Sequence, residues 1–187
     1  MIPPNQQPAK GKLIISEPAL YDFYFKQSIV LLADHNEEGS FGLIINKPID
    51  VKFNEVIKDF PNFESPVYLG GPVKTDNIFV LHKLGDRIDN SFEVMKGLYW
   101  GGSIESIKEL IAARIARPDN IRFYLGFSSW EPLQLDNEMK EKSWVVMNSK
   151  VSNVFESTPK HMWGEIMKSL GRDYAIWANF PSDPIMN

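Results

Sequence analysis

The segment IRFYLGFSSWEPLQLDNEMKEKSW, residues 121–144, decides the fold that the sequence predicts. Its first half places apolar residues at every second position, the pattern of a half-buried strand, at Ile121, Phe123, Leu125 and Phe127. The alternation stops at Ser128, and a short polar helix follows Pro132, with Leu135 and Met139 on one face. The segment therefore predicts a strand that passes into a helix through a small-residue turn. Unpaired backbone N–H groups at such a turn can hold an anion or a carbonyl oxygen.

The helix that precedes this strand has the clearest periodicity in the chain. Ser103 is suited to cap its N-terminus, and one apolar stripe continues until Pro118, at Ile104, Ile107, Leu110, Ile111 and Ile115. A last helix is predicted to begin at Thr158 and Pro159 and to end at Gly171. We expect both helices to pack against a sheet.

Two strongly apolar runs near the N-terminus predict a β-hairpin. SIVLLADH, residues 28–35, and FGLIIN, residues 41–46, are separated by a short glycine-containing connection. Because both runs are almost continuously apolar, we expect both faces of the hairpin to be covered. Strands occur in runs of two, with helices placed irregularly between them, and this favours an α+β fold with a mixed sheet.

Length and composition limit the class of protein. The chain has 187 residues, 43% of them hydrophobic, which suits one soluble domain. We expect a flexible arm over residues 1–10, which contain three prolines, and a single α+β domain over residues 11–187. A net charge of −4 argues against a surface built to neutralise many phosphates, and the absence of cysteine excludes disulfides and thiol chemistry. No apolar run has the roughly 18 residues that span a membrane, and the N-terminus resembles no signal peptide. We expect a cytoplasmic protein without a cofactor.

Four motifs in order resemble the AlgH/YqgE family of bacterial proteins. They are residues 25–32, FGLIINKP at residues 41–48, the Gly70-Gly71-Pro72 turn, and GFSSWEPLQLDNE at residues 126–138 followed by Trp144. The resemblance covers residues 11–171. It implies a compact α+β domain with a strongly bent mixed sheet surrounded by helices, and it carries the label of a transcriptional regulator without an established reaction. The chain departs from the family pattern at Ser129 and Leu133, where glycines are usual.

The most informative candidate site follows the central strand. Gln134 and Glu138 are four residues apart and share one helix face, and Trp130 and Trp144 flank that helix. An amide and a carboxylate beside two indoles form a candidate face for a polar ligand or a partner. The alternative is that the tryptophans pack the helix on the sheet while the polar groups bond their neighbours.

Two weaker candidates involve serine and histidine. Ser128 and Ser129 follow a strand as the nucleophile of a hydrolase does, although the second glycine of that motif is missing and His161 would have to supply the base. Asp34 and His35 end one strand, and His82 ends another, so a carboxylate and imidazoles could meet at one sheet edge. No spacing typical of a metal site is present.

The basic residues offer little to a DNA duplex. Lys108, Arg114, Arg117 and Arg122 are the nearest approach to a cluster, and no helix-turn-helix pair is visible. We therefore expect a regulator that acts through a partner protein or a small ligand, with direct DNA binding and membrane association disfavoured. The alternatives are a small-molecule-binding protein and a serine hydrolase that uses residues 126–138.

Overall fold

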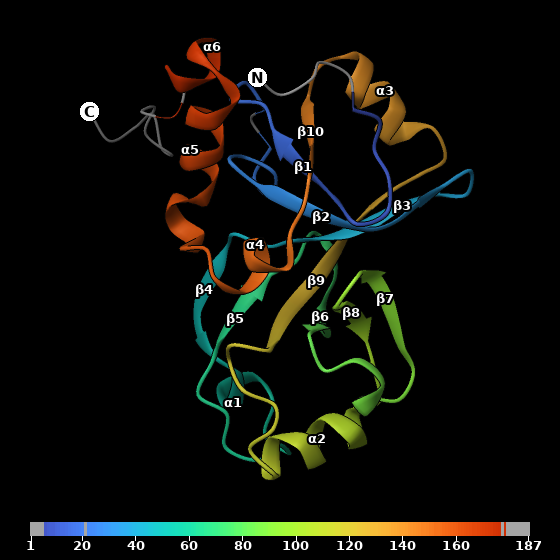
Figure 1. Ribbon diagram of the computed structural model, residues 1–187, viewed down its shortest axis with the longest axis vertical. Coiled ribbons are helices and arrows are strands. Elements are labelled where there is room, and N and C mark those ends of the chain that lie inside the picture. The colour runs from blue at the N-terminus through green and yellow to red at the C-terminus, as the bar shows by residue number, and fades with distance from the viewer. Residues whose placement is uncertain (1–5, 21, 177, 179–187) are drawn as a thin grey trace.

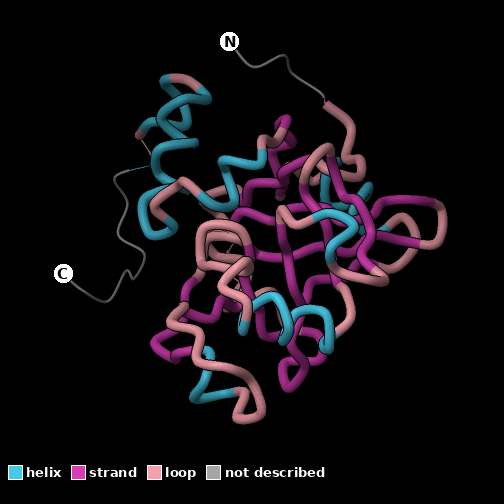
Figure 2. Tube along the Cα trace, turned by 60° about the horizontal axis from the view of Figure 1, so that its bottom comes forward, coloured by secondary structure: helices cyan, strands magenta, loops and turns pink. Residues whose placement is uncertain are grey.

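The computed structural model describes residues 6–20, 22–176 and 178. Within these residues the strands form one large sheet, and the helices lie mostly at its margins (Figures 1 and 2). The strands are β1 Lys12–Ser16, β2 Ile29–Asn36, β3 Gly39–Ile44, β4 Pro48–Lys52, β5 Pro66–Leu69, β6 Val73–His82, β7 Ser91–Met95, β8 Leu98–Gly101, β9 Ile121–Trp130 and β10 Trp144–Asn148. The helices are α1 Phe53–Val56, α2 Ile104–Ala112, α3 Gln134–Lys140, α4 Val151–Phe155, α5 Pro159–Leu170 and α6 Arg172–Ala175, with a 3₁₀ turn at Gly85–Arg87.

The sheet is largely antiparallel. Its main path runs β10-β1-β2-β3-β9-β6-β8-β7, and β5 joins from the side by pairing with both β4 and β9. Among the described strand pairs, β5 and β9 are the parallel one, with Val67 opposite Phe123. The predicted α+β fold and hairpin are confirmed, and the sheet is mixed through this one parallel pair. Strands rather than surrounding helices dominate the domain.

The sheet is strongly curled. Two strands, β9 and β6, separate β3 from β8 in the order of the sheet. A flat sheet would therefore hold β3 and β8 about 14 Å apart, at about 4.8 Å per strand. The ring centroids of Phe41 on β3 and Trp100 on β8 are nevertheless 5.4 Å apart. The curl thus brings the end of the sheet that carries β7 and β8 towards the N-terminal hairpin.

Strand β9 connects the strands β10, β1, β2 and β3 with the strands β5, β6, β8 and β7, as Figure 1 shows. Its beginning pairs with β5 and β6, and its end pairs with β3, where Trp130 lies opposite Ser40. The predicted turn at Ser128 is therefore wrong, because the alternation of β9 continues to Trp130. Hydrogen bonding to β3, a partner far away in sequence, extends the strand beyond the point where local signals end it.

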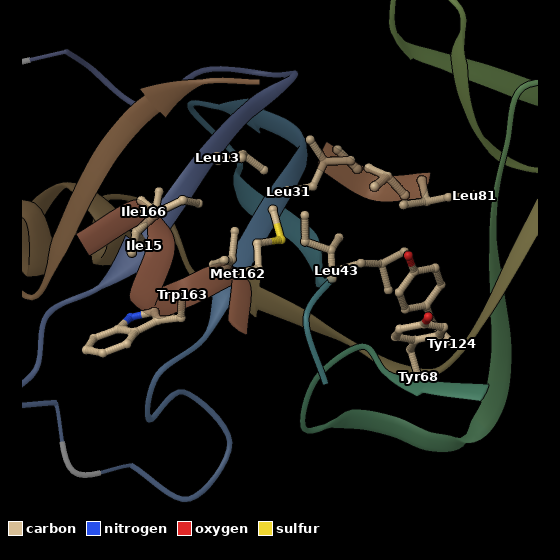
Figure 3. Packing of buried hydrophobic residues seen from close by; sticks show 14 of the residues in the cluster. Leu13, Ile15, Leu31, Leu43, Tyr68, Leu81, Tyr124, Met162, Trp163 and Ile166 are labelled. Atoms are coloured by element: carbon tan, nitrogen blue, oxygen red, sulfur yellow. The ribbon is translucent and has the colours of Figure 1, made fainter. Parts of the chain in front are cut away.

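Three buried clusters cover the two faces of the sheet. The largest lies beneath α4 and α5 and includes residues shown in Figure 3, among them Leu31, Leu43, Tyr124, Met162 and Trp163. The Trp163 indole N–H also donates to the Ser16 carbonyl at 3.0 Å, which fastens α5 to the end of β1. A second cluster lies beneath α1 and α2, and a third beneath α3.

Helix α2 begins as the sequence predicts but ends earlier than predicted. Ser103 caps it as predicted, since its side chain accepts a hydrogen bond from the Ser106 backbone N–H at 3.4 Å. Ile107 and Ile111 are buried, whereas Ile104 is 40% exposed. The helix ends at Ala112, before the predicted limit, because Arg114 adopts the left-handed conformation with φ of 58°.

The limits of the predicted domain stay a prediction. Residues 1–5 of the predicted arm lie outside the described residues, and Pro8, in its described part, is buried. In the C-terminal tail, residues 177 and 179–187 also lie outside the described residues.

Candidate functional site

The four residues of the predicted face lie together and bond to one another. We call them the tryptophan–glutamate cluster: Trp130 at the end of β9, Gln134 and Glu138 on α3, and Trp144 at the start of β10. The indole nitrogens of Trp130 and Trp144 both donate to Oε2 of Glu138, at 2.9 and 2.8 Å. The Gln134 amide donates to Oε1 of Glu138 at 2.9 Å. The structure therefore brings together what the helical spacing predicts.

The contacts of this cluster give it a structural role. Trp130 and Trp144 are only 4% and 3% exposed, and the Phe25 ring lies 5.7 and 5.4 Å from them. The Gln134 side-chain oxygen accepts the Glu131 backbone N–H at 3.0 Å. Because a buried indole N–H needs an acceptor, Glu138 satisfies two such groups and holds α3 on the sheet. A binding role for this face stays a prediction.

The two candidate serines occupy a strand instead of a turn. Ser128 is fully buried, and its hydroxyl donates to the Gly70 carbonyl at 3.1 Å. Ser129 is exposed and lies opposite Phe41 in the pairing of β9 with β3. His161 lies on the exposed side of α5, and no hydrogen bond joins it to either serine within the described part of the chain. The structure does not assemble the nucleophile and base that a serine hydrolase requires.

The histidines that end strands lie at opposite ends of β9. His82 lies opposite Ile121, where β9 begins. His35 lies opposite Ser40, which in turn pairs with Trp130, where β9 ends. A ring nitrogen of His35 lies 2.7 Å from the Ser40 hydroxyl. Asp34 and His35 therefore do not meet His82 at one sheet edge, the arrangement that their positions at strand ends allowed.

His82 is a buried, neutral histidine with its own partners. Burial lowers its pKa from 6.5 to about 4. Its Nδ1 accepts the Leu84 backbone N–H at 3.3 Å, so we assign the ring proton to Nε2, which lies 3.1 Å from the Ser91 hydroxyl. Ser91 in turn donates to the Ile88 carbonyl. With its proton on Nε2, the imidazole cannot take a proton from Ser91, so this pair is not an activated nucleophile.

Lys47 is the most perturbed lysine among the described residues. Burial lowers its pKa from 10.5 to about 8, and the nearby Lys26 acts in the same direction while Asp22 opposes it. Its ammonium donates to the Tyr24 carbonyl, which ties the segment before β2 to the connection between β3 and β4. This contact assigns the side chain a structural role.

A pocket that the sequence did not reveal lies where the curled sheet approaches itself. Its lining comes from β2, β3, β7 and β8 and from the residues before β1, and its volume is about 260 Å³. We call it the seam pocket, lined by Lys10, Ala33, Asp34, Phe41, Phe92, Glu93, Val94 and Trp100. Phe92 is 68% exposed at its rim. Of the predicted site residues, Asp34 lines this pocket.

Two other hollows are more open and less apolar. One, of about 410 Å³, lies between β4 and β5 and contains Asp50, Lys52 and Glu55. The other, of about 500 Å³, lies over the 3₁₀ turn and contains Asp86, Asp89 and Tyr99. Ligand sites are mostly apolar, with a few placed polar groups, and the seam pocket matches this description best.

The described residues contain no cluster of three or more histidine and acidic side chains that could hold a metal ion. Over the same residues, no helix is long and apolar enough to cross a membrane.

Fold and site together define a strand-dominated α+β domain with an aromatic pocket. Residues 13–175 match the profile of the family described as AlgH-like. The chain belongs to this AlgH-like family, whose members include proteins named UPF0301.

Relatives match over nearly their whole length. The UPF0301 protein of Bacteroides thetaiotaomicron is 43% identical over 184 residues, which cover 98% of this chain and 93% of that protein. The UPF0301 protein of Chlorobaculum parvum is 40% identical and covers 95% of each chain. The solution structure of the AlgH protein from Pseudomonas aeruginosa has a TM-score of 0.73 at 27% identity and covers 95% of this chain and 98% of that one. A crystal structure of a Corynebacterium diphtheriae protein, at 24% identity and a TM-score of 0.75, covers 94% of each chain and has the same fold.

Proposed function

We propose that this protein is a cytoplasmic regulator that binds a small ligand in the seam pocket and passes its effect to transcription through a partner protein, without reading DNA directly. The seam pocket is the observation that carries the proposal. It combines an apolar lining with a small number of charged groups, as small-molecule sites do. The regulatory part of the proposal rests on the family label that the sequence motifs imply.

The positions of the basic residues support an indirect action on DNA. Arg122 is only 8% exposed, and its guanidinium lies 4.8 Å from the centroid of the Tyr68 ring. It also donates to the Phe155 carbonyl at 3.3 Å, at the C-terminal end of α4. A side chain held in this way is not available to a phosphate.

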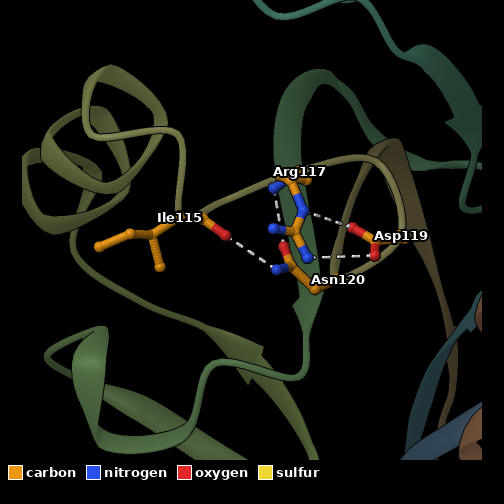
Figure 4. Close-up of polar contacts among 4 residues, drawn as sticks. All are labelled: Ile115, Arg117, Asp119 and Asn120. Carbon is orange, nitrogen blue, oxygen red and sulfur yellow. Dashed lines mark hydrogen bonds and ion pairs between the residues drawn. The ribbon is translucent and has the colours of Figure 1, made fainter.

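The neighbouring basic residues are also engaged or dispersed. Arg117 pairs with Asp119, with Nε to Oδ1 at 3.2 Å and Nη2 to Oδ2 at 3.4 Å (Figure 4). The Lys108 ammonium lies 5.1 Å from the centroid of the Phe60 ring. Phosphate contacts supply much of the affinity for a duplex, so these engaged side chains support the proposal that the protein does not read DNA directly.

The hydrolase alternative has less support. A nucleophilic serine must be reachable and must lie beside a base. Ser128 is buried and bonded to a backbone carbonyl, while Ser129 is exposed without a histidine bonded to it among the described residues. The residues that the binding proposal requires, by contrast, line one pocket.

Titration of the purified chain with duplex DNA at about 50 mM and about 200 mM salt tests the DNA part of the proposal. A protein that makes six or more phosphate contacts loses about a thousandfold in affinity between these concentrations. We expect no sequence-selective binding at either. Tight, sequence-selective binding with a steep salt dependence would overturn the proposal.

A second measurement tests the pocket. Amide and indole NMR resonances are followed while a library of small aromatic and charged fragments is added to the whole chain. We expect the shifted resonances to cluster at Phe41, Phe92 and Trp100, and Phe92→Ala to weaken the shifts. Phe23→Ala is the matched control, because Phe23 is 85% exposed and is not part of the seam pocket. Shifts confined to other surfaces, or none at all, would contradict this part.

A further inference from the structure

We infer that the seam pocket takes a small organic cation of the alkylammonium class. The inference rests on the proposed ligand-binding function and names the chemistry of its ligand. Three aromatic residues and two acidic residues line one pocket of about 260 Å³, at the seam between β2–β3 and β7–β8. Both kinds of group favour positive charge, since the faces of aromatic rings are electronegative.

The aromatic part of the lining is held in place by rings behind it. The Trp100 ring makes an edge contact with Phe41, at 5.4 Å and 72°, and a tilted contact with Phe79 at 5.6 Å. Phe79 in turn lies 5.1 Å from Phe127. An indole face is the strongest aromatic partner for a cation. Because other rings already fix Trp100, binding needs little ordering of this side chain.

The carboxylates are likewise fixed by local contacts. Asp34 accepts the His35 backbone N–H at 2.9 Å and the Asn36 amide at 3.0 Å. Glu93 accepts the Gly97 backbone N–H at 3.2 Å and interacts with Tyr99, its partner in the pairing of β7 with β8. The described residues show no salt bridge to either carboxylate. Asp34 lies opposite Phe41 in the pairing of β2 with β3, so its side chain shares the face of an aromatic residue of the pocket. Asp34 therefore keeps lone pairs for a cationic ligand.

The volume of the pocket and the charge of Lys10 limit the class of ligand further. Pockets for drug-sized molecules run from about 300 to 1,000 Å³, so a volume of about 260 Å³ suits a smaller molecule. Lys10 is the basic residue of the lining and lies in the segment before β1. Its ammonium repels a cationic ligand, so removing its charge should strengthen binding. An anionic ligand would show the opposite dependence on Lys10.

The experiment compares choline with 3,3-dimethylbutan-1-ol, a neutral molecule of nearly the same shape. Calorimetry on the whole chain measures both affinities at low and high salt. We expect choline to bind at least about tenfold more tightly and to lose affinity as salt rises. Trp100→Leu and Asp34→Asn should each weaken choline binding severalfold, and Lys10→Gln should strengthen it. Asp59→Asn is the control, because Asp59 is exposed and does not line the pocket.

The outcomes separate this inference from the function on which it rests. If the neutral alcohol binds as tightly as choline, the pocket binds ligands but the preference for a cation is wrong. If choline shows no binding at about 10 mM, the cation inference is overturned, and the fragment titration still decides whether the pocket binds anything. If choline binds but the Trp100 and Asp34 variants bind it equally well, the site lies elsewhere and the inference fails. Thermal unfolding of each variant confirms that the chain is folded.

Discussion

Trp130 and Trp144 share one acceptor, because both indole N–H groups end on Oε2 of Glu138. Their ring centroids lie 5.9 Å apart at 82°, so the second ring packs edge-on against the first while both N–H groups converge. The two residues belong to β9 and β10, which are separated by helix α3 in sequence. One carboxylate therefore joins the end of the central strand, the helix that follows it and the strand at the edge of the sheet.

Removing this acceptor should destabilise the domain strongly. Glu138→Ala leaves two buried indole donors without a partner, and each such donor costs about 1 to 3 kcal/mol. We expect the free energy of unfolding to fall by about 2 to 4 kcal/mol, measured by urea denaturation. Glu141→Ala is the matched control, because Glu141 is exposed at the C-terminal end of the same helix. Similar losses in both variants would show that the shared acceptor contributes little.

Leu133 should be a site of simple stabilisation. It is 69% exposed and has φ of 63°, in the left-handed region where side chains with a Cβ are strained by about 1 to 2 kcal/mol. Leu133→Gly removes the strain but adds flexibility to the unfolded chain, so we expect a gain of a few tenths to about 1 kcal/mol. Leu133→Ala keeps the Cβ and should gain almost nothing. Equal stabilities of the two variants would contradict the role of the backbone conformation.

The two departures from the family pattern thus have different physical meanings. At Leu133 the structure has the positive φ for which glycine is suited. At Ser129 the residue lies within β9, opposite Phe41, and the described backbone shows no positive φ there. The sequence alone identifies both positions but cannot tell which of them needs glycine for its conformation.

Much of the fold could be predicted because it depends on local periodicity. Residues 28–35 and 41–46 were predicted as a hairpin, and the structure has strands at Ile29–Asn36 and Gly39–Ile44. The spacing of Gln134 and Glu138 likewise predicts that they share a helix face, and the two side chains bond at 2.9 Å. In each case the interacting residues are neighbours in sequence.

What could not be predicted depends on strands that meet from distant parts of the chain. The extension of β9 to Trp130 follows from its pairing with β3. The seam pocket follows from the curl that brings Phe41 to Trp100. No periodicity in residues 91–101 indicates that β7 and β8 approach the N-terminal hairpin. The sequence therefore gives no reason to place Phe92 and Glu93 in a binding site.

Ser128 should behave as a structural serine. Its hydroxyl is buried and donates to the Gly70 carbonyl at 3.1 Å. A fluorophosphonate probe should therefore not label the protein, and Ser128→Ala should cost about 1 kcal/mol of unfolding free energy, the usual contribution of one hydrogen bond. Ser129→Ala, at an exposed position of the same strand, is the control and should cost less. Labelling that disappears in either alanine variant would restore the hydrolase alternative.

His82 should make the stability of the domain depend on pH in mildly acidic solution. Burial lowers its pKa from 6.5 to about 4 in the folded chain. Between these two values the unfolded chain binds a proton that the folded chain does not, so the free energy of unfolding falls as the pH falls from 6.5 towards 4. The shift corresponds to a loss of about 2 to 3 kcal/mol across this window. Above pH 6.5 neither state binds the proton, and the contribution is constant.

Replacing His82 should remove this dependence. We expect His82→Asn to lower stability at pH 7, because the ring also accepts the Leu84 backbone N–H, and to flatten the fall in stability between pH 6.5 and 4 relative to the unchanged chain. Urea denaturation at half-unit steps of pH measures both effects. Ile88→Val is the control, since it lowers stability in the same region without removing a titrating group and should keep the original slope. The His82 ring stacks on Tyr99, with centroids 5.6 Å apart, and lies beside Ser91. An unchanged slope in His82→Asn, or a His82 ring resonance that titrates near pH 6.5 in the folded chain, would show that the imidazole accepts a proton despite this packing.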